Sequence, residues 1–156
     1  MKLTIGISEE RLKICVNILA NLLADEMVLY IKTRKFHWNV SGQSFMELHK
    51  LFEAQYTEFE KVIDEIAERI GKLGSHTIGT MSEFSALTRL KESPNVYESQ
   101  KEILNELKSD HETLILELRK GINECALNRD AGTTDFLTGI LVQHETSAWV
   151  LNRYLN

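Results

Sequence analysis

The segment at residues 37–69 reads HWNVSGQSFMELHKLFEAQYTEFEKVIDEIAER and decides how the rest of the chain is interpreted. The apolar pattern breaks at Asn39 to Gly42, and Ser44 with Glu47 then predicts a capping box at the start of a helix. Beyond it, apolar residues recur at the helical spacings of three, four or seven positions, at Phe52, Phe59, Ile63, Ile66 and Ile70. The segment therefore predicts a long amphipathic helix over about Phe45 to Leu73.

Three further long helices follow from the same periodicity. They are predicted over about Ser8 to Lys35, Val96 to Leu127 and Thr134 to Tyr154, and a short helix is predicted near Ser82 to Leu90. The connection of about 20 residues that holds the short helix is too long for an up-down-up-down bundle, so it indicates one crossover. We expect an all-α fold, a single ferritin-like domain over residues 1–156. It would be a four-helix bundle with a short extra helix in the long connection between helices 2 and 3.

The composition narrows the class of protein. The net charge of −5 argues against a general nucleic-acid binder, because phosphate contacts need clustered Lys and Arg. Cys15 and Cys125 fall on apolar-periodic segments, so we expect reduced, buried thiols and not a disulfide. No signal peptide is recognised before Glu9, and no unbroken run of about 18 apolar residues predicts a transmembrane helix. The expectation is a soluble, cytoplasmic protein with no membrane partner.

Two pairs of metal-ligand residue types lie on the predicted second helix. His49 and Glu53 are one turn apart, and Asp64 and Glu68 form a second such pair. On a helical wheel both pairs lie well off the apolar stripe. His49 and Asp64 are separated by roughly 22 Å along the helix axis, whereas metal–ligand bonds are about 2 Å long. One chain therefore cannot bring both pairs to the same ion.

A two-fold assembly resolves this mismatch, because the His end of one chain would meet the Asp/Glu end of another, twice. A site inside the bundle is disfavoured, since none of the five histidines has a Glu three residues before it. The alternative is that these carboxylates, like Glu60 on the same face, are only solvated. In that case the chain would be a structural bundle without a metal centre.

Two strings carry a resemblance to a known family. His37-Trp38-Asn39-Val40, followed by Gly42, Phe45 and Leu48-His49, resembles the first signature of the Dps mini-ferritins, the DNA-binding proteins from starved cells. Asp64-Glu65-Ile66-Ala67-Glu68-Arg69 resembles the second. The resemblance implies a homododecameric shell with ferroxidase sites at its two-fold interfaces. These sites would oxidise Fe(II) with hydrogen peroxide or oxygen, and ferric mineral would be stored inside, which protects against oxidative damage.

Carried over residue by residue, the resemblance assigns His37, His49 and Glu53 to one subunit and Asp64 and Glu68 to its partner. His37, Asp64 and Glu68 would be the catalytic ligands, because hard carboxylate oxygens stabilise Fe(III) and imidazole helps to capture Fe(II). His49 and Glu53 would hold a second iron weakly. The family often has Asp at the position of Glu53, so we expect a modest change there. Zn(II) is a second candidate for the same ligands.

The resemblance also places residues around the site. Trp38, next to a ligand, would either pack at the interface or quench oxidising radicals. Glu124, Asp130 and Asp135 lie near the turn before the last helix, where family members have acidic iron-entry pores. The alternative is that Asp130 or Asp135 only caps the last helix.

DNA binding, which the family name suggests, is doubtful from this sequence. Family members that bind DNA usually do so through a Lys-rich tail, whereas this N-terminus, MKLTIGISEER, has one Lys before the predicted helix. The basic cluster Lys32, Arg34 and Lys35 lies late in the first helix, where we expect a structural role. A DNA-compacting protein remains the alternative function.

Overall fold

The computed structural model describes residues 4–97 and 99–156. Its helices are α1 (Glu9–Asn39), α2 (Phe45–Lys72), α3 (Met81–Leu87), α4 (Gln100–Leu127) and α5 (Ala131–Leu155). No strand occurs in these two ranges. The predicted four long helices and the short helix in the long connection are therefore confirmed.

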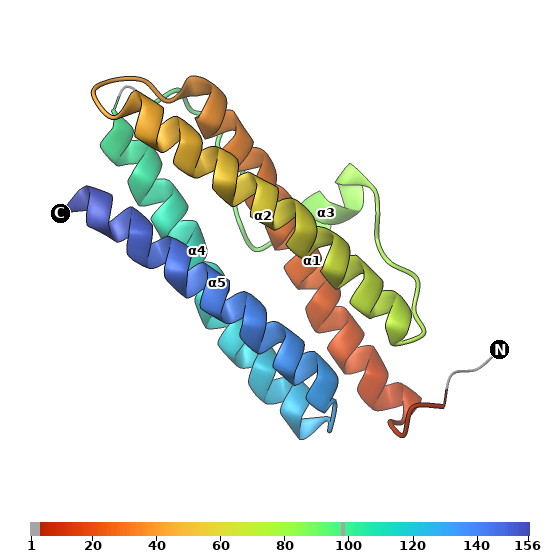
Figure 1. The fold of residues 1–156 in the computed structure, drawn as a ribbon. Helices are drawn as coiled ribbons and strands as arrows, with labels where there is room; N and C mark the ends of the chain where they lie inside the picture. The colour runs from red at the N-terminus through yellow and green to blue at the C-terminus, as the bar shows by residue number, and fades with distance from the viewer. Residues whose placement is uncertain (1–3, 98) are drawn as a thin grey trace.

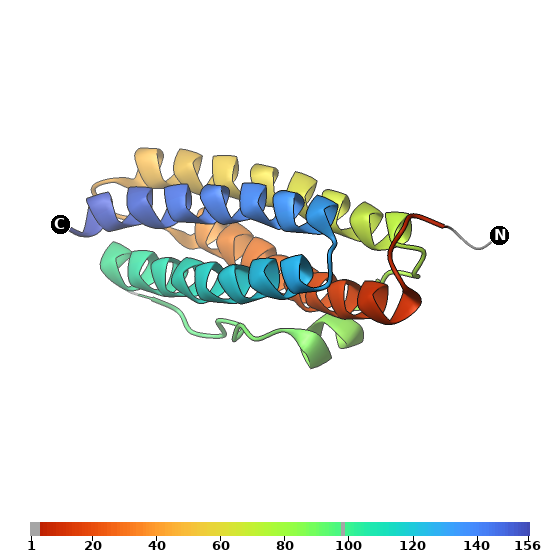
Figure 2. The same cartoon turned by 90° about the horizontal axis from the view of Figure 1, so that it is seen from below.

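The chain forms two antiparallel hairpins joined by one crossover. Helices α1 and α2 make one hairpin, and α4 and α5 make the other. The segment between α2 and α4 runs back along the bundle, so that α4 starts at the end where α2 starts (Figure 1). Seen from below, the four long helices lie side by side and α3 lies outside them (Figure 2). This is the crossover topology that the connection length predicts.

Two helix starts differ from the prediction in their capping. Ser44 is the N-cap of α2, but among the described residues its side chain makes no capping hydrogen bond, so the box with Glu47 was wrong. A capping box forms instead before α3, where Thr80 and Glu83 bond each other's backbone N–H. Hydrogen bonds from the N–H groups of Gly79 and Thr80 lower the pKa of Glu83 below its usual value. A second box, between Ser99 and Glu102, starts α4.

Helix α1 runs one turn further than predicted, to Asn39. It is also long and apolar enough, by length and composition alone, to cross a membrane. Its packing explains this composition, because α1 contacts α2, α3 and α4 and contributes a row of fully buried leucines. The same row is interrupted by the buried charged residues Asp25 and Glu26. A helix at the centre of a bundle is expected to be this apolar.

Cys15 on α1 and Cys125 on α4 meet in the core as free thiols, as predicted. Both side chains are buried, and they share a hydrogen bond. Burial raises the pKa of each thiol, because the thiolate would lose its hydration. The pair therefore packs as two small apolar groups between the hairpins.

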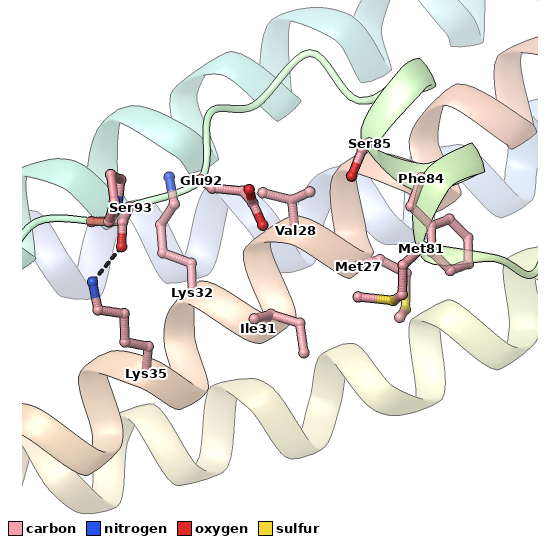
Figure 3. Close-up of a pocket in the computed structure, with 11 residues that line it drawn as sticks. Met27, Val28, Ile31, Lys32, Lys35, Met81, Phe84, Ser85, Glu92 and Ser93 are labelled. Atoms are coloured by element: carbon pink, nitrogen blue, oxygen red, sulfur yellow. Dashed lines mark hydrogen bonds between the residues drawn. The ribbon is translucent and has the colours of Figure 1, made fainter.

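An ion pair and several hydrogen bonds fasten the crossover to α1. The fully buried carboxylate of Asp25 accepts hydrogen bonds from the Thr88 hydroxyl at 3.0 Å and from the Arg89 backbone and guanidinium. Further along α1, the Lys35 ammonium donates to the carbonyl oxygen of Ser93 (Figure 3). It also donates to the carbonyl oxygen of Asn95 at 2.7 Å. An extended segment with few apolar residues is thereby held without secondary structure of its own.

A cleft of about 290 Å³ remains between α1, α3 and this segment (Figure 3). Its walls are mostly apolar, with Met27, Val28 and Ile31 on α1 facing Phe84 on α3. None of the predicted metal ligands lines it.

Candidate metal centre

The turn between α1 and α2 brings two predicted ligands together. His37 lies in the last turn of α1 and His49 in the second turn of α2. Their rings stack with centroids 3.7 Å apart and planes 19° apart. Each Nδ1 atom bonds the backbone carbonyl of the other histidine, at 2.8 Å for His37 and 2.9 Å for His49. The two histidines are thus joined by two reciprocal hydrogen bonds.

These bonds determine which nitrogen of each ring is available. A carbonyl oxygen only accepts, so Nδ1 of His37 and of His49 must each carry the proton. In a neutral imidazole the other nitrogen, Nε2, then keeps its lone pair. A hydrogen bond from Nδ1 to a backbone carbonyl is the usual support of a metal-ligating histidine. Both rings are therefore prepared to ligate through Nε2.

The three predicted carboxylate ligands lie at the surface of α2. Glu53, one turn after His49, is exposed. Asp64 and Glu68 are also exposed, near the other end of the helix, where Glu68 accepts a hydrogen bond from Lys72 at 3.0 Å. An exposed ion pair of this kind is worth little and is easily exchanged for a cation.

The structure does not bring all five predicted ligands together in one chain. Within residues 4–97 and 99–156, no three His, Cys, Asp or Glu side chains form a group that fits a metal ion. The straight run of α2 between His49 and Asp64 accounts for this, since 15 helical residues span roughly 22 Å. The predicted ligands therefore fall into two separate sets, which we call the predicted His half-site (His37, His49 and Glu53) and the predicted carboxylate half-site (Asp64 and Glu68).

Aromatic residues surround the His half-site. The ring centroids of Phe45 and His49 are 5.1 Å apart. Tyr56 packs edge-on against the His37 ring, with centroids 5.2 Å apart. Trp38 is 64% exposed, and its ring faces Arg34 at 5.7 Å. An indole so exposed beside a ligand agrees with packing against another subunit. Sequence reasoning missed Tyr56, although its position two turns after His49 on the same face was a usable signal.

The predicted pore residues differ in their surroundings. Asp130 is buried and serves as the N-cap of α5, where it accepts a hydrogen bond from the Thr133 backbone at 2.9 Å. It also pairs with Arg69 at 3.0 Å, and Gly132 leaves the room for this guanidinium, because a Cβ there would lie 2.8 Å from it. This favours the capping alternative for Asp130. Glu124 and Asp135 are exposed at the same end of the bundle.

The basic cluster on α1 is structural, as expected. Lys32 is buried and pairs with Asp110 at 2.7 Å and Glu106 at 3.2 Å. Burial raises the pKa of Asp110, and the Lys32 ammonium opposes that shift. Lys35 binds the crossover and Arg34 lies among aromatic rings. The cluster therefore presents no free basic surface to a phosphate backbone.

A second pair of histidines, which sequence reasoning did not assign, lies in the core. The Nδ1 atoms of His111 and His144 are 2.9 Å apart, and Nε2 of His144 lies 2.6 Å from Glu26 Oε1. All three side chains are buried, and Phe59 packs against both rings. Within the described part of the chain, His111 Nε2 and Glu26 Oε2 have no hydrogen-bond partner. Burial, and then the charge of His144, keep the pKa of His111 well below its ordinary value.

Comparisons with known proteins show the family to which the chain belongs. The ferritin-like domain family matches residues 16–156. The chain is 39% identical over 155 residues to an uncharacterized low temperature-induced protein of Nostoc, with 99% of this chain and 87% of that protein covered. It is 36% identical to DNA protection during starvation protein 2 of Bacillus anthracis, with 90% and 96% covered.

Among solved structures, a Dps protein from Vibrio cholerae superposes with a TM-score of 0.93 at 30% identity, with 99% of this chain and 97% of that chain covered. It is described as a member of a broad superfamily of ferritin-like diiron-carboxylate proteins. The expected ferritin-like fold is therefore confirmed.

Proposed function

Because the chain belongs to the ferritin-like family, and within it to the Dps proteins, we propose that it is an iron-storing ferroxidase. It would oxidise Fe(II) at sites shared between subunits and hold the ferric mineral inside a homododecameric shell. Iron storage and protection fit the diiron-carboxylate superfamily. The observation that carries the finer proposal is the His half-site, whose two imidazoles are both turned to ligate through Nε2.

Each half-site supplies a different part of the chemistry. Nε2 of His37 captures Fe(II), while the partner's Asp64 and the partner's Glu68 add hard anionic oxygens that favour Fe(III). His49 and Glu53 hold a second iron more weakly. Few strong ligands leave coordination positions open for water and peroxide. Fe(II) is the substrate and hydrogen peroxide, or oxygen, is its oxidant.

The shared site is tested by subunit complementation. One variant carries His37→Ala and His49→Ala, and the other carries Asp64→Ala and Glu68→Ala. Each alone should mineralise iron at the rate of the uncatalysed reaction. When the two are co-expressed, half of randomly formed two-fold pairs are mixed, and each mixed pair has one whole site. About a quarter of the wild-type rate should therefore return.

The controls separate the outcomes. No recovery in mixed shells would contradict the sharing of ligands between subunits. Double carboxylate variants that oxidise Fe(II) as fast as the wild type would show that the centre lies elsewhere. Mass measurement of the native particle, expected at about twelve times 17.9 kDa, tests the shell.

Other parts of the proposal concern entry, metal and location. Glu124 and Asp135 are the pore residues that we retain, because both carboxylates are exposed. Zn(II) is expected to compete for the same ligands. We place the protein in the cytoplasm, with no membrane partner.

A gel shift at physiological salt tests the alternative of DNA compaction. A negative result is expected, because Lys32 is buried in an ion pair and Lys35 is hydrogen-bonded to the crossover.

A further inference from the structure

The Nδ1 hydrogen bond alone does not fix the His37 ring. This bond restrains the torsion about the Cβ–Cγ bond of His37, but a single hydrogen bond tolerates a range of angles and the torsion itself has a broad energy profile. The direction of Nε2 therefore depends on what touches the two faces and edges of the ring. One contact is the stacked ring of His49, and the other is the ring of Tyr56, at 5.2 Å and an interplanar angle of 80°.

The Tyr56 ring is in turn held by Arg34. The guanidinium carbon of Arg34 lies 4.6 Å from the centre of that ring, and the Tyr30 ring meets the same tyrosine edge-on at 6.3 Å. Among the described residues, the Tyr56 hydroxyl makes no hydrogen bond. Tyr56 is thus positioned through its ring and not through its polar end.

Arg34 is fixed at several points. Its Nη1 atom donates to the Tyr30 hydroxyl at 2.6 Å, and its guanidinium carbon also lies 5.7 Å from the centre of the Trp38 ring. Tyr30, Arg34 and Trp38 follow one another at four-residue spacing, which places them on one face of α1. A positive charge near a cation site would weaken cation binding, so charge does not explain this residue. The planar guanidinium group explains the presence of an arginine here, because it stacks on aromatic faces and a lysine ammonium does not.

From these contacts we infer that Arg34 and Tyr56 are positioning residues for the iron ligand His37. Arg34 holds the Tyr56 ring, and the Tyr56 ring sets the plane in which His37 presents Nε2. This inference rests on the proposed function. Groups that only orient a metal ligand are commonly worth about 10- to 100-fold in metal affinity or activity.

The test compares Tyr56→Leu, Tyr56→Phe and Arg34→Lys in the assembled wild-type background. Tyr56→Leu should raise the KM for Fe(II) about 10-fold with kcat nearly unchanged. Tyr56→Phe keeps the ring and should restore the wild-type KM. Arg34→Lys keeps the positive charge but removes the planar guanidinium group, so its KM for Fe(II) should rise as in Tyr56→Leu. Tyr154→Leu, a surface tyrosine on α5, is the matched control.

Two further measurements keep the inference separate from folding and from the proposed function. Native particle mass shows that each variant assembles. Co(II) titration, followed by absorption, reports metal affinity even if the wild type oxidises no iron, in which case the proposed function fails and the positioning role is still tested. The inference is overturned if Tyr56→Phe raises the KM for Fe(II) as much as Tyr56→Leu does. It is also overturned if Tyr56→Leu binds Co(II) as tightly as the wild type.

Discussion

The molecule holds two pairs of adjacent histidines whose surroundings are opposite. At one end of the bundle, His37 and His49 donate hydrogen bonds from Nδ1 to backbone carbonyls, and Nε2 of each ring remains available. In the core, the Nδ1 atoms of His111 and His144 face each other, and His144 Nε2 is taken by the buried carboxylate of Glu26. The same residue type thus leaves a ring nitrogen available for the proposed metal in one place and makes internal hydrogen bonds in the other.

The difference lies in the partner of each imidazole. A backbone carbonyl fixes the tautomer but leaves one nitrogen bare, whereas the core pair uses three of its four nitrogens in side-chain contacts. Burial then keeps His111 neutral. We therefore expect changes at the first pair to affect iron chemistry and changes at the second to affect stability.

The largest effect is expected at Asp64 and Glu68, the carboxylates that we propose to complete the site of the first pair. Asp64→Asn with Glu68→Gln keeps the shape of both side chains but removes their anionic oxygens. The rate of Fe(II) oxidation should fall at least about 100-fold, because groups that merely orient ligands are already worth about 10- to 100-fold. The midpoint of thermal unfolding should stay within about 2 °C, since both residues are exposed. A large fall in this midpoint would show that Asp64 and Glu68 also support the stability of the fold.

The next effect is expected in the core. His144→Leu removes the partner of Glu26 and leaves a buried carboxylate without a hydrogen bond. The free energy of unfolding should fall by about 3 kcal/mol, measured by urea denaturation of metal-free protein. The oxidation rate per assembled particle should not change. An equal loss of iron oxidation in correctly assembled particles would contradict a purely structural role for this pair.

The pH dependence of stability sharpens the comparison. The pKa of His111 lies well below its ordinary value of 6.5 in the folded protein, chiefly through burial. The unfolded chain binds a proton there that the folded chain does not, so stability is complete above about pH 6.5 and declines as the pH falls below it. This residue contributes a slope of up to about 1.4 kcal/mol per pH unit. His111→Phe should remove that slope, whereas His76→Gln, at an exposed position, should leave it.

The smallest effect is expected at Glu53, the weaker ligand of the first pair. Glu53→Asp shortens the side chain by one methylene and keeps an oxygen donor. The rate of Fe(II) oxidation should change by no more than about 3-fold, or roughly 0.7 kcal/mol of activation free energy. Stopped-flow absorbance with the second equivalent of Fe(II) measures this. A loss as large as that of the Asp64 and Glu68 variants would mean that the second iron position is not the weaker one.

Much of the fold can be predicted from the sequence alone. The sequence predicts much less about the two histidine pairs. Apolar periodicity predicted the four long helices, and a short helix was predicted separately in the long connection, whose length also predicted the crossover. The capping of α2 was predicted wrongly, because a Ser-x-x-Glu string is compatible with a start that makes no side-chain bond. The core pair was not recognised, because His111 and His144 are 33 residues apart and lie in ordinary apolar stripes.

The sequence by itself determined the helices, the crossover and the separation of the two half-sites. These depend on local periodicity and on the fixed rise of a helix, which need no knowledge of neighbours. Only the tertiary structure decided which nitrogen of each histidine is available, that Asp130 is a buried cap, and that Tyr56 lies between Arg34 and His37. Such facts depend on which side chains distant in sequence come within a few ångströms, and helix packing alone sets that.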